Sequence, residues 1–334
     1  MGDSTVLDVV IVGAGPAGVS CAIWLARLGF QPVLLEGSDR IGGLCCDHPF
    51  SDGWNATLPE MTGPEVARNL ARSLELAHVD TRLSCRVIKI ERVSANGTPI
   101  GKMVIRHAGI DDPDEHLTAA GEVHDAPIWH VHVDRKSPPL RTRHVVLATG
   151  VSPRTLPGWP ADKPLPPGVV AGPGTAVVQQ DFAGARVAVL GGGDNAFENA
   201  LYARQHGAAH VNIFARTVRA QQQFVQQFPA HDVVHGSYEV DAQRRTVNGQ
   251  SFDLILVFYG WEARLPDMSG QPLQRCANGF VVTHPKTAET SLPGVYAIGE
   301  VALRMHPCVV TAMADGVTAA KAIQARLEMV ATPA

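Results

Sequence analysis

Two copies of one pattern constrain the fold of this chain most strongly. In each copy an apolar run leads into a glycine turn and then into a stretch with the apolar period of a helix, at residues 9–28 and 187–205. A second apolar run follows each copy, at 32–36 and 210–214. A continuous apolar run predicts a strand buried on both faces, and a glycine turn between strand and helix opens a βαβ unit. The sequence therefore predicts an α/β fold with two Rossmann-type dinucleotide-binding domains.

The region between the two copies has the pattern of an antiparallel meander. Segments of β character alternate with turn-forming or acidic segments, and we expect strands at 86–93, 103–107, 128–133 and 144–148. The turns and acidic residues between them predict a long exposed hairpin around 95–140.

Breaks in composition predict where the domains divide. A proline- and glycine-rich stretch at 153–173 is typical of a linker, and we expect a second linker after 258–260. The alanine-rich tail at 311–328 has helical periodicity and is expected to pack on the first domain. The second domain is thus predicted as an insertion in the first, with 1–157 as the first part of domain one, 158–260 as domain two and 261–334 as the second part of domain one.

The first glycine turn has the spacing Gly13-x-Gly15-x-x-Gly18. Such glycines allow a tight bend and let a pyrophosphate approach the helix N-terminus, whose free N–H groups favour an anion. Glu36 ends the second apolar run, where a carboxylate can accept hydrogen bonds from ribose hydroxyls. The alternative is an ordinary glycine turn, but the strand before it and the helix after it favour a dinucleotide site.

The second glycine turn reads Gly191-x-Gly193-x-x-Ala196, and the residues after its second strand differ from those of the first copy. No acid stands there; Arg216 and Arg219 are present instead. An acid would repel a 2′-phosphate, whereas an arginine can hold one bidentately. The residues therefore predict a first site for a cofactor with a free ribose and a second for NADPH, unless the two arginines are only solvated surface cations.

Composition excludes several other classes of protein. The 28 Lys and Arg residues against 32 Asp and Glu give a net charge of −4 with no like-charge block, so we expect no nucleic-acid or membrane partner. The six cysteines include no Cys-x-x-Cys pair, which argues against a disulfide scaffold and a structural zinc site. The fourteen histidines include no His-x-x-x-His pair or comparable cluster, so no metal site is predicted. A cytoplasmic protein with reduced thiols is the expectation.

Three motifs together resemble a known family. Gly-Gly-Gly-Asp-Asn-Ala-x-Glu at 191–198, Leu-Ala-Thr-Gly at 147–150 and Val-Tyr-Ala-Ile-Gly-Glu at 295–300 are similar to motifs of the pyridine-nucleotide disulfide oxidoreductases. In size the chain resembles the low-molecular-weight thioredoxin reductases and the thioredoxin reductase-like ferredoxin–NADP reductases. The resemblance covers nearly the whole chain, the hairpin around 95–140 being the main excess. It implies FAD in the first domain, NADPH in the second, a homodimer, and a rotation of the second domain that brings nicotinamide to flavin.

The resemblance also implies an FAD site in the first domain. Two departures from the family pattern stand in it: Leu44 follows Gly42-Gly43 with no Gln between them, and Glu300 replaces an Asp that holds the ribityl chain or pyrophosphate. The implied FAD residues are Gly13, Gly15, Pro16, Ala17 and Gly18 around the pyrophosphate, Glu36 at the adenosine ribose, Gly43, Leu44 and Asn55 near the flavin, Val87 at the adenine, and Thr149, Gly150, Gly299, Glu300 and Val309.

The implied NADPH site lies at the second glycine turn. Arg216 and Arg219 fall near a family His-Arg-Arg segment that binds the 2′-phosphate, but Ala215 occupies one of its positions, so NADH remains possible. The implied residues are Gly191, Gly193, Asp194, Asn195 and Ala196 around the pyrophosphate, and Arg216 and Arg219 at the 2′-phosphate.

The family's redox Cys-x-x-Cys is missing. Thioredoxin reductases carry it ahead of the second glycine turn, where this chain has Gly-Thr-Ala-Val at 174–177. Neither glycine nor valine has a thiol, and a thiolate must attack the target disulfide. The ordinary thioredoxin reductase mechanism is therefore excluded.

Three other cysteines fall where the family places the flavin. Cys45 and Cys46 follow Gly42-Gly43-Leu44, and Cys308 occupies the place of a family Arg-Gln pair. A bond between Cys45 and Cys46 would be strained, because neighbouring Cα atoms lie about 3.8 Å apart and disulfides usually span about 4.4–6.8 Å. Pairing of Cys308 with either is conceivable, although free cysteines are commonly small buried hydrophobes. We expect structural roles for the remaining three, Cys21, Cys85 and Cys276.

These expectations combine into one leading hypothesis and two alternatives. The leading one is an FAD-dependent oxidoreductase that passes hydride from NADPH to FAD and electrons onward to ferredoxin, flavodoxin or a thioredoxin-like carrier. A flavin-dependent thiol/disulfide oxidoreductase using Cys45, Cys46 or Cys308 is the first alternative. A non-catalytic FAD-binding redox sensor is the second, against which the well-kept motif at 191–198 argues.

Overall fold

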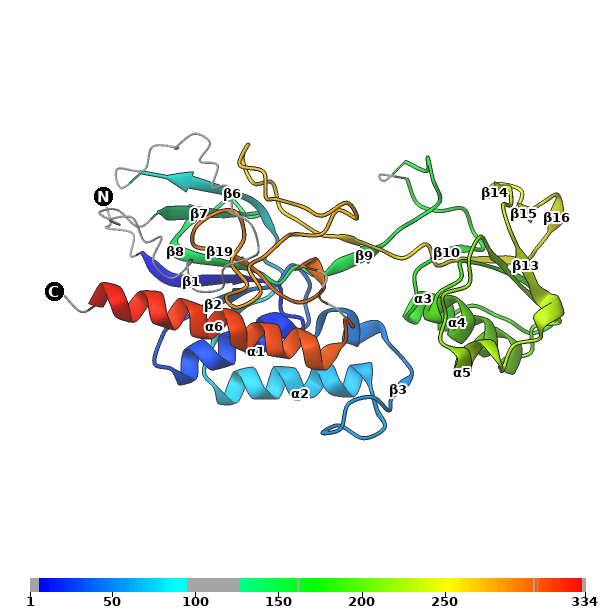
Figure 1. The fold of residues 1–334 in the computed structure, drawn as a ribbon, viewed down its shortest axis with the longest axis horizontal. Coiled ribbons are helices and arrows are strands. Elements are labelled where there is room, and N and C mark those ends of the chain that lie inside the picture. Colours follow the sequence, from blue (N-terminus) through cyan, green and yellow to red (C-terminus); the bar gives the residue numbers. More distant parts are fainter. Residues whose placement is uncertain (1–5, 95–126, 161–162, 303, 305, 332–334) are drawn as a thin grey trace. The chain divides into compact units, whose positions relative to one another are not determined.

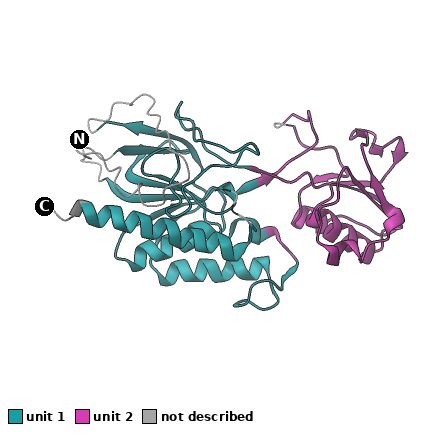
Figure 2. Cartoon of the chain, in the orientation of Figure 1, with its two compact units in different colours: residues 1–46, 50–151, 263–334 teal, residues 47–49, 152–262 magenta. Residues whose placement is uncertain are grey.

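The computed structural model describes residues 6–94, 127–160, 163–302, 304 and 306–331. The expected strand at 103–107, and most of the expected hairpin around 95–140, lie outside these residues. The chain forms two compact units, each described by itself below (Figure 2). Unit 1 comprises residues 1–46, 50–151 and 263–334, and unit 2 comprises 47–49 and 152–262.

Unit 1 is built on a sheet whose strand order is β5-β2-β1-β8-β7-β6, with β19 also paired to β8 (Figure 1). The strands β5, β2, β1, β8 and β19 are parallel, as expected for βαβ units. Strand β1 is buried over its last four residues because the sheet is covered on both faces. These five strands are β1 (Leu7–Val12), β2 (Val33–Leu35), β5 (Asp80–Arg82), β8 (Leu140–Leu147) and β19 (Val295–Ala297).

Three helices pack together on one face of this sheet (Figure 1). They are α1 (Pro16–Arg27), α2 (Gly63–Leu76) and α6 (Val309–Ala331). Helix α6 lies against α1, where Gly316 leaves no room for a Cβ beside the carbonyl oxygen of Ala17. The expected packing of the alanine-rich tail on the first domain is confirmed. Small residues on both helices permit the close approach.

An antiparallel meander continues the sheet beyond β8 and adds side chains to the core on the face away from the three helices. It consists of β6 (Val87–Val93), β7 (Ile128–Val133) and the first half of β8, paired antiparallel. The two halves of β8 pair with different strands on this side: residues 140–142 pair with β7, and residues 145–147 pair with β19. The expected strands at 86–93, 128–133 and 144–148 are present, the last beginning four residues earlier than expected. The expected antiparallel pairing of the last is wrong, because residues 144–147 pair parallel with β1 and only residues 140–142 pair antiparallel with β7. Short elements complete the unit: 3-10 turns at Gly43–Asp47 and Gly299–Ala302, and strands β3 (Ser51–Asp52) and β4 (Met61–Thr62).

Unit 2 repeats the architecture in a smaller form. Its parallel sheet has the order β10-β17-β11-β12-β13, with α4 packed on one face and a small antiparallel sheet on the other. Its elements are β10 (Val169–Ala171), α3 (Thr175–Val178), β11 (Arg186–Leu190), α4 (Asp194–Gln205), β12 (His210–Ala215), α5 (Gln222–Val225), a 3-10 turn (Ala230–Asp232), β13 (Val233–His235), β14 (Val240–Asp241), β15 (Thr246–Val247), β16 (Gln250–Ser251) and β17 (Leu254–Val257).

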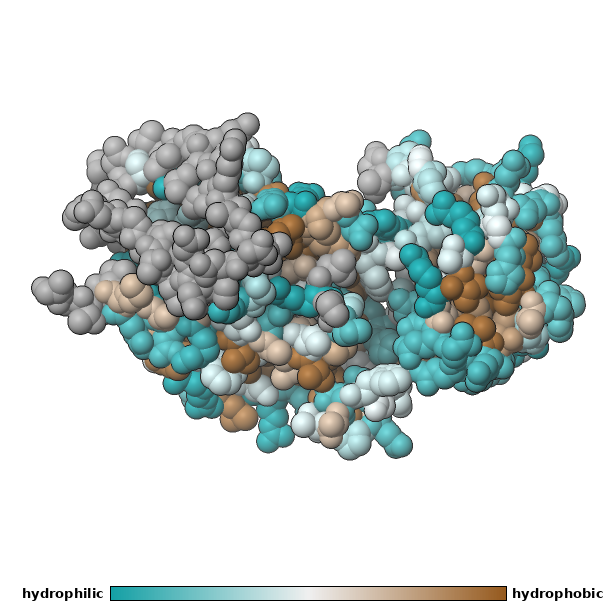
Figure 3. Space-filling view, viewed as in Figure 1, coloured by the Kyte–Doolittle hydropathy of each residue, from teal (hydrophilic) through white to brown (hydrophobic). Residues whose placement is uncertain are grey.

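The chain passes from unit 1 to unit 2 and back through β9 (Val151–Pro153) and β18 (Trp261–Ala263), which pair with each other. The α/β fold with two Rossmann-type units, one inserted in the other, matches the expectation. Figure 3 shows apolar surface as several patches among hydrophilic residues on the visible face. Within the described part of the chain, no helix is long and apolar enough to cross a membrane.

Candidate functional site

The first glycine turn joins β1 to α1 and is held by two glycines. Gly13 has a φ of 107°, and a Cβ there would lie 2.3 Å from the carbonyl oxygen of Ala148. A Cβ on Gly18 would lie 2.0 Å from the carbonyl oxygen of Gly13. Gly15 differs, because its backbone is extended and the nearest atom to a Cβ would be the Cα of Gly43 at 3.9 Å. Gly15 therefore leaves an open face beside the N-terminus of α1, which fits the approach of a pyrophosphate.

Glu36 stands directly after β2 and bonds to this turn. Its Oε2 accepts a 2.7 Å hydrogen bond from the backbone N–H of Ala14. Its Oε1 accepts hydrogen bonds from the backbone N–H and the hydroxyl of Ser38, at 2.8 and 2.9 Å. A carboxylate has about four acceptor sites and three are used here, so one on Oε2 remains for a ribose hydroxyl. The structure thus brings Glu36 to the glycine turn, as expected of a dinucleotide site.

A second backbone layer lies against the glycine turn at Gly42 and Gly43. The N–H of Gly42 donates to the carbonyl oxygen of Ala14 at 2.8 Å, and a Cβ on Gly43 would lie 3.1 Å from the Cα of Gly15. Leu44, beside them, is exposed. Asn55 is buried, and its side-chain oxygen accepts hydrogen bonds from both the N–H and the hydroxyl of Thr57.

The C-terminal part of the chain completes this edge of the sheet. Gly299 has a φ of 70°, and its N–H donates to Asp315 of α6 at 3.0 Å. Glu300 beside it is half-buried, and this burial raises the pKa of its carboxyl. The guanidinium of Arg304 donates from Nε to both carboxylate oxygens of Asp315, at 3.0 Å. A pocket opens here, lined by Gly299, Glu300, Arg304, Pro307, Cys308, Thr311, Ala312 and Asp315.

The remaining expected FAD residues all lie in unit 1. Thr149 and Gly150 follow β8, whose carboxyl end lies beside that of β1, and the Thr149 hydroxyl donates to the carbonyl oxygen of Arg264. Val87 is the first residue of β6, and Val309 is the first residue of α6. Pro16 and Ala17 begin α1.

The second glycine turn, between β11 and α4, repeats the first in detail. Gly191 has a φ of 134°, and a Cβ there would lie 2.3 Å from the carbonyl oxygen of Phe258. A Cβ on Gly192 would lie 2.1 Å from the carbonyl oxygen of Thr217. Gly193 is extended, with no atom within 4 Å of a Cβ. Unit 2 thus presents the same open glycine at a helix N-terminus, which also fits a pyrophosphate.

The arginine-bearing segment after β12 is fastened to this turn. The carbonyl oxygen of Gly192 accepts hydrogen bonds from the backbone N–H groups of Arg219 and Ala220, at 2.6 and 3.0 Å. The carboxylate of Asp194 accepts two from Gln221, at 2.7 and 2.9 Å. The side chain of Asp194 therefore supports the loop. Of the other expected residues, Asn195 accepts a hydrogen bond from Asn199 with its carbonyl oxygen, and Ala196 is fully buried.

Two tyrosines stand near the first of the arginines. The hydroxyls of Tyr238 and Tyr259 are hydrogen-bonded at 3.2 Å. Burial raises the pKa of both phenols, while the charge of Arg216 acts on both in the opposite direction. Both tyrosines therefore stay protonated at neutral pH, and because Tyr238 donates to Tyr259, the Tyr259 hydroxyl keeps a free donor near the exposed Arg216.

The cysteines are distributed unevenly between the two units. Residues 47–49 and 152–262 contain none, so all six belong to unit 1. The stretch 174–177, where the family dithiol would stand, forms the start of the short helix α3. Unit 2 therefore has no thiol of its own.

The six cysteines are free thiols in different surroundings. Burial raises the pKa of Cys45 to about 11. The thiol of Cys46 donates to the carbonyl oxygen of Ile41 at 3.1 Å, and Cys308 is exposed at the pocket beside Gly299. Cys21 and Cys85 are buried, in agreement with the structural roles expected of them, whereas Cys276 is exposed and its thiol does not pack in the core.

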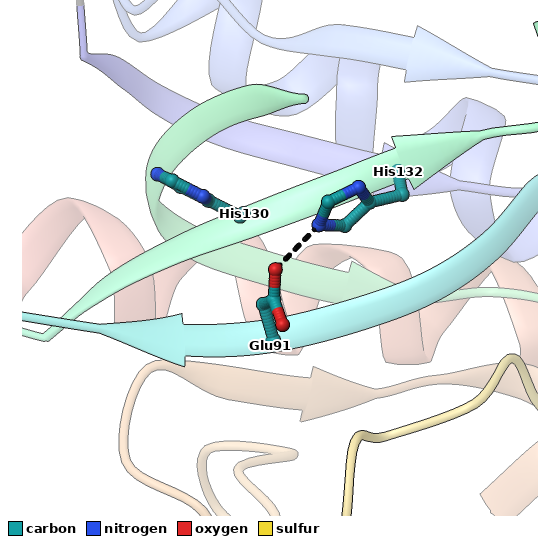
Figure 4. Close-up of side chains that lie close together, drawn as sticks. All are labelled: Glu91, His130 and His132. Atoms are coloured by element: carbon teal, nitrogen blue, oxygen red, sulfur yellow. Dashed lines mark hydrogen bonds and ion pairs between the residues drawn. The ribbon is translucent and has the colours of Figure 1, made fainter. Parts of the chain in front are cut away.

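One group of potential ligands is not apparent from helical spacing in the sequence. Glu91 of β6 and His130 and His132 of β7 lie together, with one ligand atom from each within 4.8 Å of the others (Figure 4). His-x-x-x-His places two rings on one face of a helix, whereas His-x-His does the same on a strand, and this second spacing is the signal that could have found the pair. Glu91 could not have been added without the strand register, which sets it opposite His130.

Comparison with known proteins agrees with this geometry. The family described as "Pyridine nucleotide-disulphide oxidoreductase" matches residues 7–316. Thioredoxin reductase of Peptoclostridium litorale is 25% identical over 345 residues, covering 94% of this chain and 95% of that protein. Ferredoxin–NADP reductase of Gluconobacter oxydans is 27% identical over 354 residues, covering 95% and 91%.

Solved structures share the fold at lower identity. Thioredoxin reductase of Lactococcus lactis superposes with a TM-score of 0.71 at 23% identity, covering 97% of this chain and 99% of that one. Bacillithiol disulfide reductase Bdr of Bacillus cereus superposes with a TM-score of 0.72 at 16% identity, covering 96% and 100%. At these identities the likeness concerns the fold alone.

Proposed function

The chain belongs to the pyridine nucleotide-disulphide oxidoreductase family, and from this premise we propose that it takes hydride from NADPH and passes electrons through FAD to a separate carrier protein. Family membership makes it an oxidoreductase and implies flavin and nicotinamide cofactors. The choice of NADPH, the residues that bind each nucleotide and the carrier belong to the proposal.

Each unit has a glycine with free space beside a helix N-terminus, which supports one nucleotide-binding site in each unit. In unit 1, Gly15 would admit the FAD pyrophosphate and Glu36 would accept a hydrogen bond from its ribose. In unit 2, Gly193 would admit the second pyrophosphate. The flavin supplies hydride and electron transfer, and the chain supplies binding and alignment.

The residues after β12 support NADPH as the hydride donor. Arg216 and Arg219 are exposed where a ribose-binding acid would otherwise stand, so a 2′-phosphate would meet positive charge. The backbone of Arg219 is fixed to Gly192, and protonated tyrosine hydroxyls lie near Arg216. These groups provide donors for a 2′-phosphate, and the carboxylate of Asp194 is already held by two hydrogen bonds from Gln221.

The observation that carries the proposal is the absence of cysteine from unit 2. A thioredoxin reductase of this architecture passes electrons through a dithiol in its second domain, and that route is closed here. Electrons on the flavin must therefore leave by another path. The similarity to a protein named ferredoxin–NADP reductase favours an iron–sulfur or flavin carrier as acceptor. A homodimer belongs to the same proposal.

Anaerobic mixing of the purified flavoprotein with NADPH tests this directly. We expect rapid bleaching of the flavin absorbance, slower bleaching by NADH, and rapid reoxidation on addition of ferredoxin or flavodoxin. Bleaching without reoxidation by either carrier would contradict the acceptor but leave the NADPH step standing. No bleaching by either nucleotide would contradict the reductase and favour the redox sensor.

The alternative, a thiol/disulfide oxidoreductase, has one supporting observation: Cys308 is exposed beside Gly299 and Glu300. The raised pKa of Cys45 opposes it, because a protonated thiol is a poor nucleophile. Titrating thiols after anaerobic NADPH reduction separates the two. A gain in thiols relative to the oxidised enzyme would support the alternative, whereas our proposal expects none.

A further inference from the structure

A pair of cross-strand contacts on the outer edge of the unit 1 sheet is not used by the proposed reaction. In the antiparallel register of β6 and β7, Glu91 lies opposite His130 and Lys89 lies opposite His132. The Nε2 atom of His132 and Oε1 of Glu91 are 2.7 Å apart. Figure 4 shows the Glu91 carboxylate below and between the two imidazole rings in this view.

The imidazole ring of His130 has an unsatisfied nitrogen. Nε2 of His130 is buried and has no hydrogen-bond partner in the described part of the protein. Buried ring nitrogens nearly always have a partner, so a bare one calls for an explanation. The rings of His130 and His132 meet edge to face at 6.3 Å between centroids, a contact that gives this nitrogen no hydrogen bond.

The donor atoms of the three side chains suit a metal ion. Each residue offers one ligand atom, which gives two imidazole nitrogens and one carboxylate oxygen. Metal ions bind neutral imidazole and ionised carboxylate.

The neighbouring cations act on this group in two ways. Nζ of Lys89 contacts the second oxygen of Glu91 at 2.6 Å and so fixes the carboxylate while leaving Oε1 for a ligand. Arg141 of β8 stands opposite His130 on its other side, and its charge opposes a bound cation. The site therefore offers one carboxylate and two imidazoles, while the nearby cations repel any bound cation. This favours a transition-metal ion, which imidazole binds well, over an ion held mainly by charge.

We propose that Glu91, His130 and His132 bind a divalent transition-metal ion, Zn²⁺ in the first place. Two imidazole nitrogens and one carboxylate oxygen are a common zinc donor set, with water in the remaining tetrahedral position. Ligands of one zinc ion lie about 3.3 Å apart, so small rotations of the three side chains within their 4.8 Å span suffice. The ion would replace the direct bond between His132 and Glu91 and satisfy the bare nitrogen of His130.

The consequence is structural. Strand β6 is the last strand of the sheet: β7 pairs with it on one side, and on the other Asp267 forms an isolated bridge with it. A metal ion that joins Glu91 to two residues of β7 would cross-link that last strand to its neighbour. An ion that binds only the folded state raises the free energy of unfolding by mass action. We therefore expect Zn²⁺ to raise the unfolding temperature of the protein without entering electron transfer.

The test uses the tag-free holoenzyme after removal of metal with a chelator. We expect one tight Zn²⁺ per chain in a competition titration, and an X-ray absorption spectrum with nitrogen and oxygen neighbours at about 2.0–2.1 Å. The H130A/H132A variant should lose affinity by about 100-fold or more while keeping its flavin. The matched control is H210A/H235A, which removes two exposed histidines of unit 2 and should bind as the wild type does.

Three results would overturn the site. Sulfur neighbours at about 2.3 Å would assign the ion to cysteines instead. Equal affinity for Zn²⁺ in H130A/H132A and H210A/H235A would show that the ion binds elsewhere. Absence of Zn²⁺ binding by the wild type would refute the proposed site. The absorption spectrum is measured on the wild type, so it tests the ligands of the ion even if the variant misfolds.

Discussion

The backbone N–H of Ala14 donates a 2.7 Å hydrogen bond to the carboxylate of Glu36. This bond joins the glycine turn after β1 to the residue that follows β2, two points 22 positions apart in the chain. It connects the glycine turn, which is expected to bind the pyrophosphate, to Glu36, which is expected to accept a hydrogen bond from the ribose. Loss of the carboxylate should therefore affect both the turn and the nucleotide.

Glu36→Ala should release FAD and weaken the fold moderately. The substitution leaves the N–H of Ala14 without its charged acceptor, which costs about 1–3 kcal/mol of the free energy of unfolding. The ratio of flavin to protein absorbance after gel filtration measures retention, and denaturant unfolding measures stability. Glu75→Ala, an exposed glutamate on α2, serves as control and should keep its flavin. Full FAD retention by Glu36→Ala would refute the ribose role.

Alanine substitutions at two glycines of the first turn should fail in different ways. Gly15→Ala fits the protein, because the backbone is extended and the nearest atom is 3.9 Å away, so it should fold but bind FAD poorly. Gly13→Ala combines a φ of 107° with a 2.3 Å approach to a carbonyl oxygen and should not fold stably. Circular dichroism with flavin content separates the outcomes. Normal FAD binding by Gly15→Ala would show that the open face is not the pyrophosphate site.

Arg216→Ala should separate the two nicotinamide nucleotides. Removing a charged donor to a 2′-phosphate should weaken NADPH binding by about 10- to 100-fold and leave NADH nearly unchanged. The dependence of the flavin bleaching rate on nucleotide concentration gives both affinities. Arg244→Ala, at an exposed arginine of the same unit, is the control. An equal loss for both nucleotides would show that Arg216 does not bind the 2′-phosphate.

His144 should make the protein sensitive to acid. Burial, with charges of Arg326 and Arg143, lowers its pKa to about 3, whereas the unfolded chain titrates near 6.5. As pH falls from 6.5 towards 3 the unfolded state gains a proton that the folded state refuses, so stability falls by about 1.4 kcal/mol per pH unit. His144→Asn cannot gain this proton, and its free energy of unfolding should vary less between pH 6.5 and 4.5. Parallel pH profiles for the two proteins would disprove this.

The sequence was informative wherever a local pattern determines the structure. Both glycine turns, the parallel strands around them and the place of Glu36 depend on residues close together in the chain, and all appear as expected. The C-terminal helix was also predictable from its period. Which of the glycines are closed by packing was not predictable, because the atoms that meet Gly13 and Gly191 come from distant segments.

The register between strands and the exposure of single side chains could not be predicted from the sequence. His130 and His132 become neighbours of Glu91 only through the pairing of β6 with β7. Cys276 was expected to have a structural role, and its side chain is exposed. The compact units divide at 151/152 and 262/263, within the paired strands β9 and β18; the domain limits expected from the proline-rich stretch, at 157/158 and 260/261, remain a prediction.

The most direct test of the central claim is an anaerobic titration of the oxidised flavoprotein with NADPH. A disulfide takes up two electrons in addition to those of the flavin, so an active dithiol would raise consumption to about two NADPH per FAD. The absence of cysteine from unit 2 predicts an end point near one NADPH per FAD, with unchanged thiol content. An end point near two, with newly titratable thiols, would contradict the proposed electron path.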